Sequence, residues 1–404
     1  MSIKKILIGY EYGSGMGHLS RMLPVGRVLS DRNYQIIFFL HNPIECAKII
    51  AKEKLSILPV MWMATRIPEM GTPPRFHSYS DIMAAAGAYN VEQLFTLTLS
   101  WKTIFDIYKP DLIVCDHSPN CCLAAFNRIP VVLIGDGFTL PPVHESIFPV
   151  TRGATPVFAP DQLLENMRIV QKMHGRRIPQ TITEPFRTAA RLFCTLSELD
   201  HYPLMRRDTV IGPPLSDLLE PAEPPTEPRW FAYLKLGFLA TNKILESLCD
   251  VKFPGEVYIN GLLPEFEARL AHNNIVVHRD PPPMSQILPR VSVILHHGGN
   301  GVACAALSAG RPQLLVPMYQ ETELTGERLR RMGVGRILTP TDVQSGNMVN
   351  LLSAIAESQT MMERAQTVAR NIHARGPSRF LETCIETCEK ILAGNTASQT
   401  ATYN

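Results

Sequence analysis

Short runs of apolar residues alternate with longer amphipathic stretches along most of this chain of 404 residues. In the first half the runs cover residues 5–9 (KILIG), 35–40 (QIIFFL), 111–116 (DLIVCD) and 130–135 (PVVLIG). Each run is apolar at consecutive positions, which is typical of a strand buried on both faces of a sheet. Helices are predicted between the runs, the first of them over 19–30. The pattern predicts a parallel sheet that helices cover on both sides.

The same alternation returns in the second half of the chain. The apolar runs there cover residues 230–237, 256–261, 274–278, 291–297 and 311–317. Six prolines lie between Pro213 and Pro228, and proline lacks a backbone donor, so this segment is expected to be a semi-rigid linker. We predict two doubly wound α/β domains. Their expected bounds are 1–212 for the N-terminal domain, 213–228 for the linker, 229–393 for the C-terminal domain, whose last helix can pack back on the first, and 394–404 for a disordered tail.

Composition and charge are those of an ordinary globular enzyme, with 45% apolar residues, 19% charged residues and a net charge of +2. This balance does not indicate a nucleic-acid partner. The nine cysteines are odd in number and have no C-x-x-C spacing, which favours free thiols in a reducing compartment. No signal peptide and no membrane-spanning run is visible, so we expect a cytoplasmic protein, with peripheral membrane contact left open. The expected oligomeric state is a monomer or a homodimer.

A glycine-rich loop follows the first predicted strand, in the stretch GYEYGSGMGHLSRML (9–23). Gly13, Gly15 and Gly17 occupy alternate positions, and His18 stands where a dinucleotide-binding fingerprint would have its third glycine. In parallel sheets, ligands bind beyond the carboxyl ends of the strands, which is where this loop lies. The loop therefore places a titratable imidazole at a candidate ligand site.

A second loop of this kind lies in the second half of the chain. The run 291–297 ends at His297 and is followed by Gly298, Gly299 and an alanine-rich helix. Backbone N–H groups and the dipole at such a helix start favour an anion, and the arrangement suits a diphosphate. It is not a Walker loop, because no G-K-[ST] follows.

The stretch HHGGNGVACAALSAGRPQLLVP (296–317), followed by GERLRRMGVGRIL (326–338), resembles the donor-binding signature of the UDP-glycosyltransferase superfamily. Its bacterial branch, which glycosylates small natural products, is the most similar. The resemblance covers nearly the whole chain, through the stretches 15–39, 110–132, 194–203 and 280–299. It implies the GT-B fold, in which two Rossmann-like domains face each other across a cleft.

The resemblance also implies a catalytic pair in the N-terminal domain. His18 matches the family's catalytic histidine, a general base for the acceptor hydroxyl, and Asp116 matches the aspartate that orients it. The loop glycines would then clear space for an acceptor, and the helix dipole would lower the pKa of His18. The alternative is that His18 is a helix-start residue and Asp116 a loop cap. His117 is expected to be a packing or acceptor-side residue.

On the donor side, the resemblance implies that His297 donates to the leaving diphosphate, helped by the N–H groups of Gly298 and Gly299, while His296 is structural. No metal and no cofactor are expected besides a UDP- or dTDP-linked sugar as co-substrate. The expected donor-binding residues are His297, Gly298, Gly299, Asn300, Gly301, Val302, Glu321, Thr322, Gly237, Lys235, Pro281 and Pro282.

Several of these residues depart from the family's pattern. Glu321 and Thr322 replace an Asp-Gln pair that binds sugar hydroxyls, Val302 replaces a phosphate-binding hydroxyl, and Pro281 replaces an aromatic residue that stacks on uracil in plant members. Lys235 either compensates with a point charge near the diphosphate or is an ordinary surface lysine. Because of these departures, the sequence does not determine which sugar and which nucleotide the donor contains.

Two long loops, 61–90 and 136–160, line the acceptor pocket by family position. The expected acceptor-binding residues are Gly15, Met16, Trp62, Phe76, Tyr79 and Phe138, with Met61, Met63 and Phe148 adding apolar surface. Such surface suits a flat or lipophilic acceptor. The alternative is that these side chains only pack the loops onto the domain.

The sequence thus favours an inverting, metal-independent glycosyltransferase that moves a sugar from a nucleotide donor to a hydroxyl of a small lipophilic or aromatic acceptor. An alternative is a catalytically idle relative that serves as an activating or binding partner, which the departures would support. A sugar-nucleotide epimerase with the same fold is a third interpretation.

Overall fold

The computed structural model describes residues 3–13, 16–62, 76–214, 218–236 and 241–398. The chain divides into two compact units. The first unit contains residues 1–194, residues 202–212 and the chain from Arg379 onward, and the second contains residues 195–201 and 213–378.

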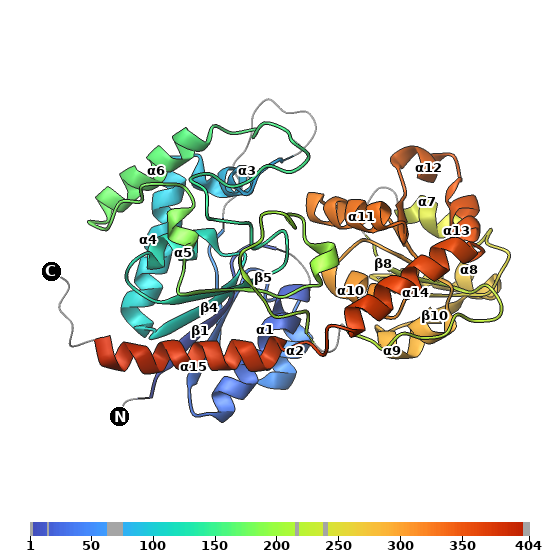
Figure 1. Ribbon diagram of the computed structural model, residues 1–404, viewed down its shortest axis with the longest axis horizontal. Coiled ribbons are helices and arrows are strands. Elements are labelled where there is room, and N and C mark those ends of the chain that lie inside the picture. Colours follow the sequence, from blue (N-terminus) through green and yellow to red (C-terminus); the bar gives the residue numbers. More distant parts are fainter. Residues whose placement is uncertain (1–2, 14–15, 63–75, 215–217, 237–240, 399–404) are drawn as a thin grey trace. The chain divides into compact units, whose positions relative to one another are not determined.

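Within the described residues, the first unit contains a seven-stranded sheet in the order β3-β2-β1-β4-β5-β6-β7, and all its neighbouring strands run parallel. Figure 1 labels β1, β4 and β5 of this sheet. The strands are β1 (Lys5–Tyr10), β2 (Gln35–Leu40), β3 (Ile57–Pro59), β4 (Leu112–Asp116), β5 (Val131–Gly135), β6 (Ala190–Phe193) and β7 (Thr209–Val210). Ile6, Leu7 and Ile8 of β1 are fully buried, as a strand covered on both faces requires. The direction of winding reverses at β1, between β2 and β4, which makes the β1/β4 edge the topological switch point.

Helices cover both faces of this sheet. They are α1 (Gly17–Asp31), α2 (Ala47–Glu53), α3 (Tyr79–Met83), α4 (Val91–Tyr108), α5 (Pro119–Ala125), α6 (Pro160–Met173) and α15 (Phe380–Ser398). Leu7 packs in the core under α4, α5 and α6, whereas Ile6 and Ile8 pack in the core under α1 and α15. The alternation of side chains along β1 therefore supplies two cores, one on each face.

Helix α15 completes the first unit although it comes from the end of the sequence. Phe380, Cys384 and Cys388 are buried in the same core as α1. Figure 1 shows α15 in red. The helix extends to Ser398, so the tail expected to be disordered from residue 394 is helical over its first five residues. Residues 399–404 lie outside the described part of the chain.

The described part of the second unit contains a six-stranded sheet in the order β10-β9-β8-β11-β12-β13, again parallel throughout. Its strands are β8 (Trp230–Lys235), β9 (Gly255–Asn260), β10 (Val276–His278), β11 (Val293–His296), β12 (Gln313–Leu315) and β13 (Gly335–Ile337). The winding reverses at β8, so the β8/β11 edge is the switch point of this sheet. The prediction of doubly wound parallel sheets is confirmed.

The helices of the second unit are α7 (Thr241–Leu248), α8 (Pro264–His272), α9 (Met284–Ile287), α10 (Asn300–Ser308), α11 (Gln320–Met332), α12 (Pro340–Gln344), α13 (Met348–Ala356) and α14 (Gln359–His373). Trp230 and Val293 pack on the side of α7 and α13, whereas Phe231 and Ile294 pack on the side of α9 and α10. No described helix is long and apolar enough to cross a membrane.

The proline-rich segment lies against the second unit over its described residues. The guanidinium of Arg311, which is fully buried, donates to the carbonyl oxygens of Ala222 at 2.8 Å, Glu223 at 2.6 Å and Leu288 at 2.7 Å. The Ser308 hydroxyl accepts from the backbone N–H of Leu219 at 2.9 Å. The segment is therefore held by specific hydrogen bonds to the C-terminal unit.

Candidate active site

The carboxyl ends of β1 and β4 bring two predicted residues together in the first unit. Tyr10 and Asp116, the last residues of these strands, are paired in register. Helix α1 begins at Gly17, after the loop that follows β1, and places His18 in its first turn. The switch point of the sheet thus carries an imidazole and a carboxylate on neighbouring elements.

The side chains of His18 and Asp116 form a direct hydrogen bond. The distance from His18 Nδ1 to Asp116 Oδ2 is 2.7 Å, and the Asp116 side chain is fully buried. The Tyr10 ring stacks on the imidazole with 4.8 Å between ring centroids. A carboxylate bonded to Nδ1 keeps the proton there in the neutral ring and directs the basic lone pair of Nε2 outward. This is the geometry of a general base and its orienting residue.

Gly13 has a specific role beside the imidazole. Its φ of +115° is one that residues with a Cβ rarely adopt, and a Cβ at this position would lie 2.2 Å from His18 Nε2. By contrast, a Cβ at Gly17 would meet no atom within 4 Å. Only the first of these two glycines therefore clears space at the basic nitrogen. Gly15, between them, lies outside the described residues.

Two further charged residues join this pair, and sequence reasoning missed both. Arg21 Nη1 donates to Asp116 Oδ2 at 2.7 Å, and Nη2 donates to Asp136 Oδ2 at 3.1 Å. Burial alone raises the pKa of Asp116, but the Arg21 guanidinium and the His18 imidazole outweigh burial and hold that pKa below its usual range. The signals were present in the sequence. Arg21 is three residues from His18 on one helix face, and Asp136 directly follows a buried strand.

The β8/β11 edge of the second unit carries His297 in a bridging position. Its Nε2 accepts from the backbone N–H of Lys235 at 2.9 Å, and its Nδ1 donates to the carbonyl oxygen of Val316 at 3.0 Å. Burial lowers the pKa of this imidazole. Nε2 thus acts as an acceptor in this structure, and the ring ties the end of β8 to the segment after β12. Donation by His297 to a leaving diphosphate stays a prediction.

The two residues that flank His297 are also tied to the protein. His296 is buried, donates through Nε2 to Gln313 Oε1 at 2.9 Å, and accepts at Nδ1 from the N–H of Gly298 at 3.0 Å. The Gly298 N–H, expected to face a diphosphate, is thus engaged within the loop. Gly299 directly precedes helix α10, and a Cβ there would meet no atom within 4 Å. The start of α10 therefore remains the candidate anion-binding feature of this edge.

The other expected donor-binding residues are spread along the same edge of the sheet. Asn300, Gly301 and Val302 form the first turn of α10, Glu321 and Thr322 the first turn of α11, and Pro281 and Pro282 follow β10. The Thr322 hydroxyl accepts from the N–H groups of Met318 and Tyr319 at 3.0 and 3.1 Å, so it caps its own helix. The Asn300 amide oxygen accepts from the Thr195 hydroxyl at 2.6 Å. Gly237 lies outside the described residues.

Comparison with known proteins bears on both units. Residues 267–387 match the family model described as "Erythromycin biosynthesis protein CIII-like, C-terminal domain". A segment of 114 residues is 31% identical to erythronolide mycarosyltransferase of Saccharopolyspora erythraea and covers 28% of this chain and 27% of that protein. A segment of 98 residues is 24% identical to the NDP-glycosyltransferase YjiC of Bacillus subtilis, covering 24% of this chain and 25% of the relative. The sequence matches thus span about a quarter of each curated relative.

Solved structures extend the likeness to nearly the whole chain. The calicheamicin glycosyltransferase CalG4 aligns with 97% of this chain and 99% of its own at a TM-score of 0.63 and 17% identity. The glycosyltransferase VinC, solved in complex with dTDP, aligns with 97% of this chain and 100% of its own at a TM-score of 0.60 and 15% identity. These likenesses show the GT-B fold, and the family model and the relatives supply the sequence link. The chain is thus similar in sequence to natural-product glycosyltransferases over residues 267–387, and similar in fold to such enzymes over nearly its whole length.

The expected acceptor-binding residues differ in exposure. Tyr79 and Phe148 are buried in the core, with 5.1 Å between their ring centroids, so for these two the structure favours the packing alternative. Met16 and Trp62 are exposed, with 41% and 54% of their surface accessible. Phe76 is half-buried, and Met63 lies outside the described residues.

His117 lies beside the His18–Asp116 pair. Its backbone is in the left-handed region with φ of 38°, and its buried Nε2 has no hydrogen-bond partner. Burial, together with the nearby His18, lowers the pKa of His117 to about 4. The ring is flanked by Tyr12 and Phe138, with centroids 5.5 and 6.0 Å away. His117 is therefore neutral near pH 7 and packs among aromatic rings.

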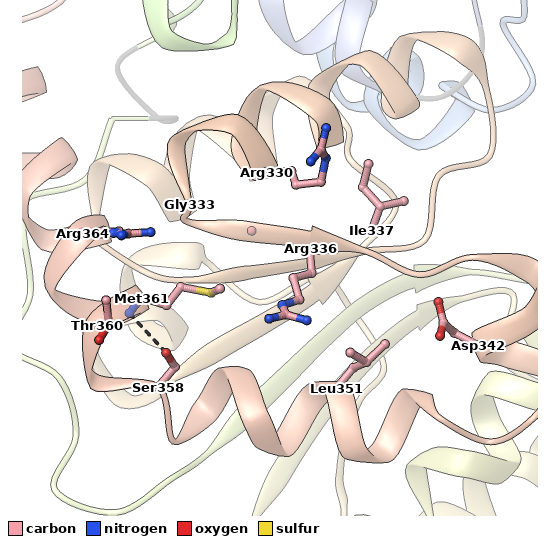
Figure 2. Close-up of a pocket in the computed structure, with 11 residues that line it drawn as sticks. Arg330, Gly333, Arg336, Ile337, Asp342, Leu351, Ser358, Thr360, Met361 and Arg364 are labelled. Atoms are coloured by element: carbon pink, nitrogen blue, oxygen red, sulfur yellow. Dashed lines mark hydrogen bonds between the residues drawn. The ribbon is translucent and has the colours of Figure 1, made fainter.

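A hollow elsewhere in the second unit is separate from the expected donor edge. This hollow has a volume of about 610 Å³. Figure 2 shows that Arg330, Arg336 and Arg364 line it, together with residues of β13 and α14. Strand β12 separates β13 from β11, so His297 after β11 is about 10 Å or more from this edge. None of the expected donor-binding residues that the structure describes lines the hollow. Among the described residues, no group of three His, Cys, Asp or Glu side chains could hold a metal ion.

Proposed function

We propose that the chain is an inverting glycosyltransferase that moves a sugar from a nucleoside diphosphate donor to a hydroxyl group of a small acceptor. The observation that carries this proposal is the 2.7 Å hydrogen bond between His18 Nδ1 and the buried Asp116 carboxylate at a sheet switch point. A base near neutral pKa and a fixed orienting anion are what a hydroxyl nucleophile requires. The sequence similarity to glycosyltransferases and the GT-B fold support the same reaction.

The reaction is a single displacement at the anomeric carbon. The acceptor oxygen attacks that carbon while the bond to the diphosphate oxygen breaks, and His18 Nε2 takes up the hydroxyl proton. Asp116 stabilises the imidazolium that forms. Because the nucleophile enters opposite the leaving group, the configuration at the anomeric carbon inverts. The proton on His18 is released to solvent after the glycoside leaves.

The leaving diphosphate is held by the start of helix α10 and the loop that His297 braces. N–H groups at a helix start, with the positive end of the helix dipole, stabilise developing negative charge without a metal ion. VinC and SsfS6 were solved with thymidine diphosphate, which supports a dTDP- or UDP-linked donor here. The bridging position of His297 keeps this loop in place.

The acceptor is proposed to be a lipophilic natural product, in keeping with relatives such as erythronolide mycarosyltransferase. The exposed side chains of Met16 and Trp62 supply apolar surface for such a molecule. All nine cysteines are free thiols, which supports a reducing, cytoplasmic setting for the reaction.

The test is a screen of UDP- and dTDP-sugars against a panel of macrolide and aromatic polyketide acceptors, read by mass spectrometry of the glycoside. His18→Ala serves as the matched control in every reaction. Product formed by the wild type and lost in the variant supports the proposal, and NMR of the product decides whether the anomeric configuration is inverted. Product of retained configuration, or equal turnover by His18→Ala, would contradict it.

A further inference from the structure

Arg21 lies between two carboxylates at the ends of neighbouring strands. One guanidinium nitrogen donates to Asp116, which ends β4, and the other donates to Asp136, which follows β5. Arg21 is 6% exposed and Asp136 is 4% exposed, so solvent screens this network weakly. The other oxygen of Asp136 accepts from the backbone N–H groups of Phe138 and Thr139 at 2.9 and 3.1 Å. Each member of the network is therefore held in place by hydrogen bonds.

The charges in this network determine how readily His18 can take up a proton. Asp116 alone would favour the imidazolium, but the adjacent Arg21 cation cancels most of that effect. Asp136 on the far side of Arg21 cancels the cation in turn. Two carboxylates and one guanidinium leave a net charge of minus one, which becomes zero when His18 is protonated. The buried network is thus closest to neutral in the imidazolium state.

We propose that Arg21 and Asp136 are positioning residues that hold the Asp116 carboxylate against His18 and, through their opposite charges, set the basicity of the imidazole. The inference rests on the proposed function only in assigning His18 as the base. Neither residue touches the reacting atoms. Both act through Asp116.

Other titratable groups face this network from several elements. The stacked ring of Tyr10 on β1 has a pKa raised by burial, so the phenol stays neutral. His117 is neutral near pH 7, as described above, and burial lowers the pKa of His41, which lies near His18. The thiols of Cys194, after β6, and Cys384, on α15, lie near Arg21. The carboxylate of Glu45 lies near Tyr10 and His41. Asp116 bonds His18 directly, and Arg21 and Asp136 extend the hydrogen-bonded network from it.

The test measures the pKa of His18 by NMR titration of the imidazole, assigned by its loss in His18→Gln, without any donor or acceptor. Asp136→Asn should lower this pKa, since the imidazolium then faces an uncancelled guanidinium, by on the order of one unit. Arg21→Gln should raise it by a similar amount. The double variant has the wild-type net charge and should titrate close to the wild type.

Asp208→Asn is the matched control, because Asp208 is 9% exposed in its side chain and pairs with Arg191 and Arg206 in the same unit. It should leave the His18 titration unchanged. The two single variants have opposite expected signs, so either one that folds decides the question. An unchanged pKa in a folded single variant, or an equal shift in Asp208→Asn, overturns the inference.

The titration also separates this inference from the proposed function. If the pKa moves as expected but no sugar transfer is found, the network sets the basicity of His18 and the reaction was assigned wrongly. If sugar transfer is found but the pKa of His18 is unchanged in the variants, the proposed function is supported and the inference about the charge network is wrong. With an active donor and acceptor, the acid limb of kcat/KM should move in the same directions.

Discussion

Replacing Gly13 by alanine tests whether the loop glycine exists to keep His18 in its reactive position. A Cβ at residue 13 would lie 2.2 Å from His18 Nε2, whereas non-bonded heavy atoms need about 3.5 Å. The imidazole must therefore move by about 1 Å. That movement stretches the 2.7 Å bond to Asp116. A displacement of this size typically costs about 10²-fold in turnover.

The same change also strains the backbone. An alanine held at the φ of +115° found at Gly13 costs roughly 1–3 kcal/mol, and this fraction of a typical stability of about 5–15 kcal/mol leaves the protein folded. We expect Gly13→Ala to lower kcat about 10²-fold and the urea midpoint modestly. Affinity for free dTDP or UDP, measured by calorimetry, should be unchanged, because the proposed site for that ligand lies in the second unit.

Gly17→Ala is the control within the same loop. A Cβ at Gly17 meets no atom within 4 Å. Gly17 is in the first turn of α1, where alanine has a higher helix propensity than glycine. This variant should keep wild-type turnover and unchanged or slightly higher stability. Wild-type turnover in Gly13→Ala, or an equal loss in both variants, would refute the reasoning. NMR signals of the His18 ring report the displacement even without a substrate.

Three further predictions follow from the same contacts. His18→Ala should lower kcat by roughly 10²–10⁴-fold and leave diphosphate affinity unchanged, and turnover assays with calorimetry check this. His297→Ala should weaken diphosphate binding by about 1–3 kcal/mol and also lower the urea midpoint, since the ring joins Lys235 to Val316; a binding loss without a stability loss would speak for direct contact with the ligand. His117 has a pKa of about 4 in the folded protein against an ordinary 6.5, so the unfolded chain binds the proton first as the pH falls, and stability is lost between pH 6.5 and 4. In His117→Phe, the fall in the free energy of unfolding over that pH range should be smaller than in the wild type by on the order of 3 kcal/mol, measured by urea unfolding at both ends of the range. An identical fall in the two proteins would show that this imidazole is not responsible.

The long strands and both switch-point loops could be predicted from the sequence because buried parallel strands are apolar at consecutive positions. The strands β3, β6, β7 and β13 were not predicted, since segments of two to four residues are too short to show a pattern. Their pairing depends on neighbouring strands. The sequence also predicts the bounds of α1 to within two residues at its start and one at its end.

The pairing of His18 with Asp116 followed from the family resemblance, which matched both residues to one site. The bridging role of His297 did not, because no local pattern indicates that its nitrogens contact Lys235 and Val316, each distant in sequence. Arg21 was hidden for a related reason. A charged residue on an amphipathic helix is usually solvated, and only the tertiary fold places two carboxylates around it.

Helix α15 has a consequence for how the chain folds during synthesis. Most of the first unit, up to residue 212, leaves the ribosome early. The core beneath α1 also needs Phe380, Cys384 and Cys388, which are synthesised more than 160 residues later. Until α15 has been synthesised, part of an apolar face of the nascent sheet stays exposed, which favours chaperone binding or aggregation. The second unit, complete at residue 378, can fold first. In this chain the first unit, which carries the proposed base, is therefore the last to complete its fold.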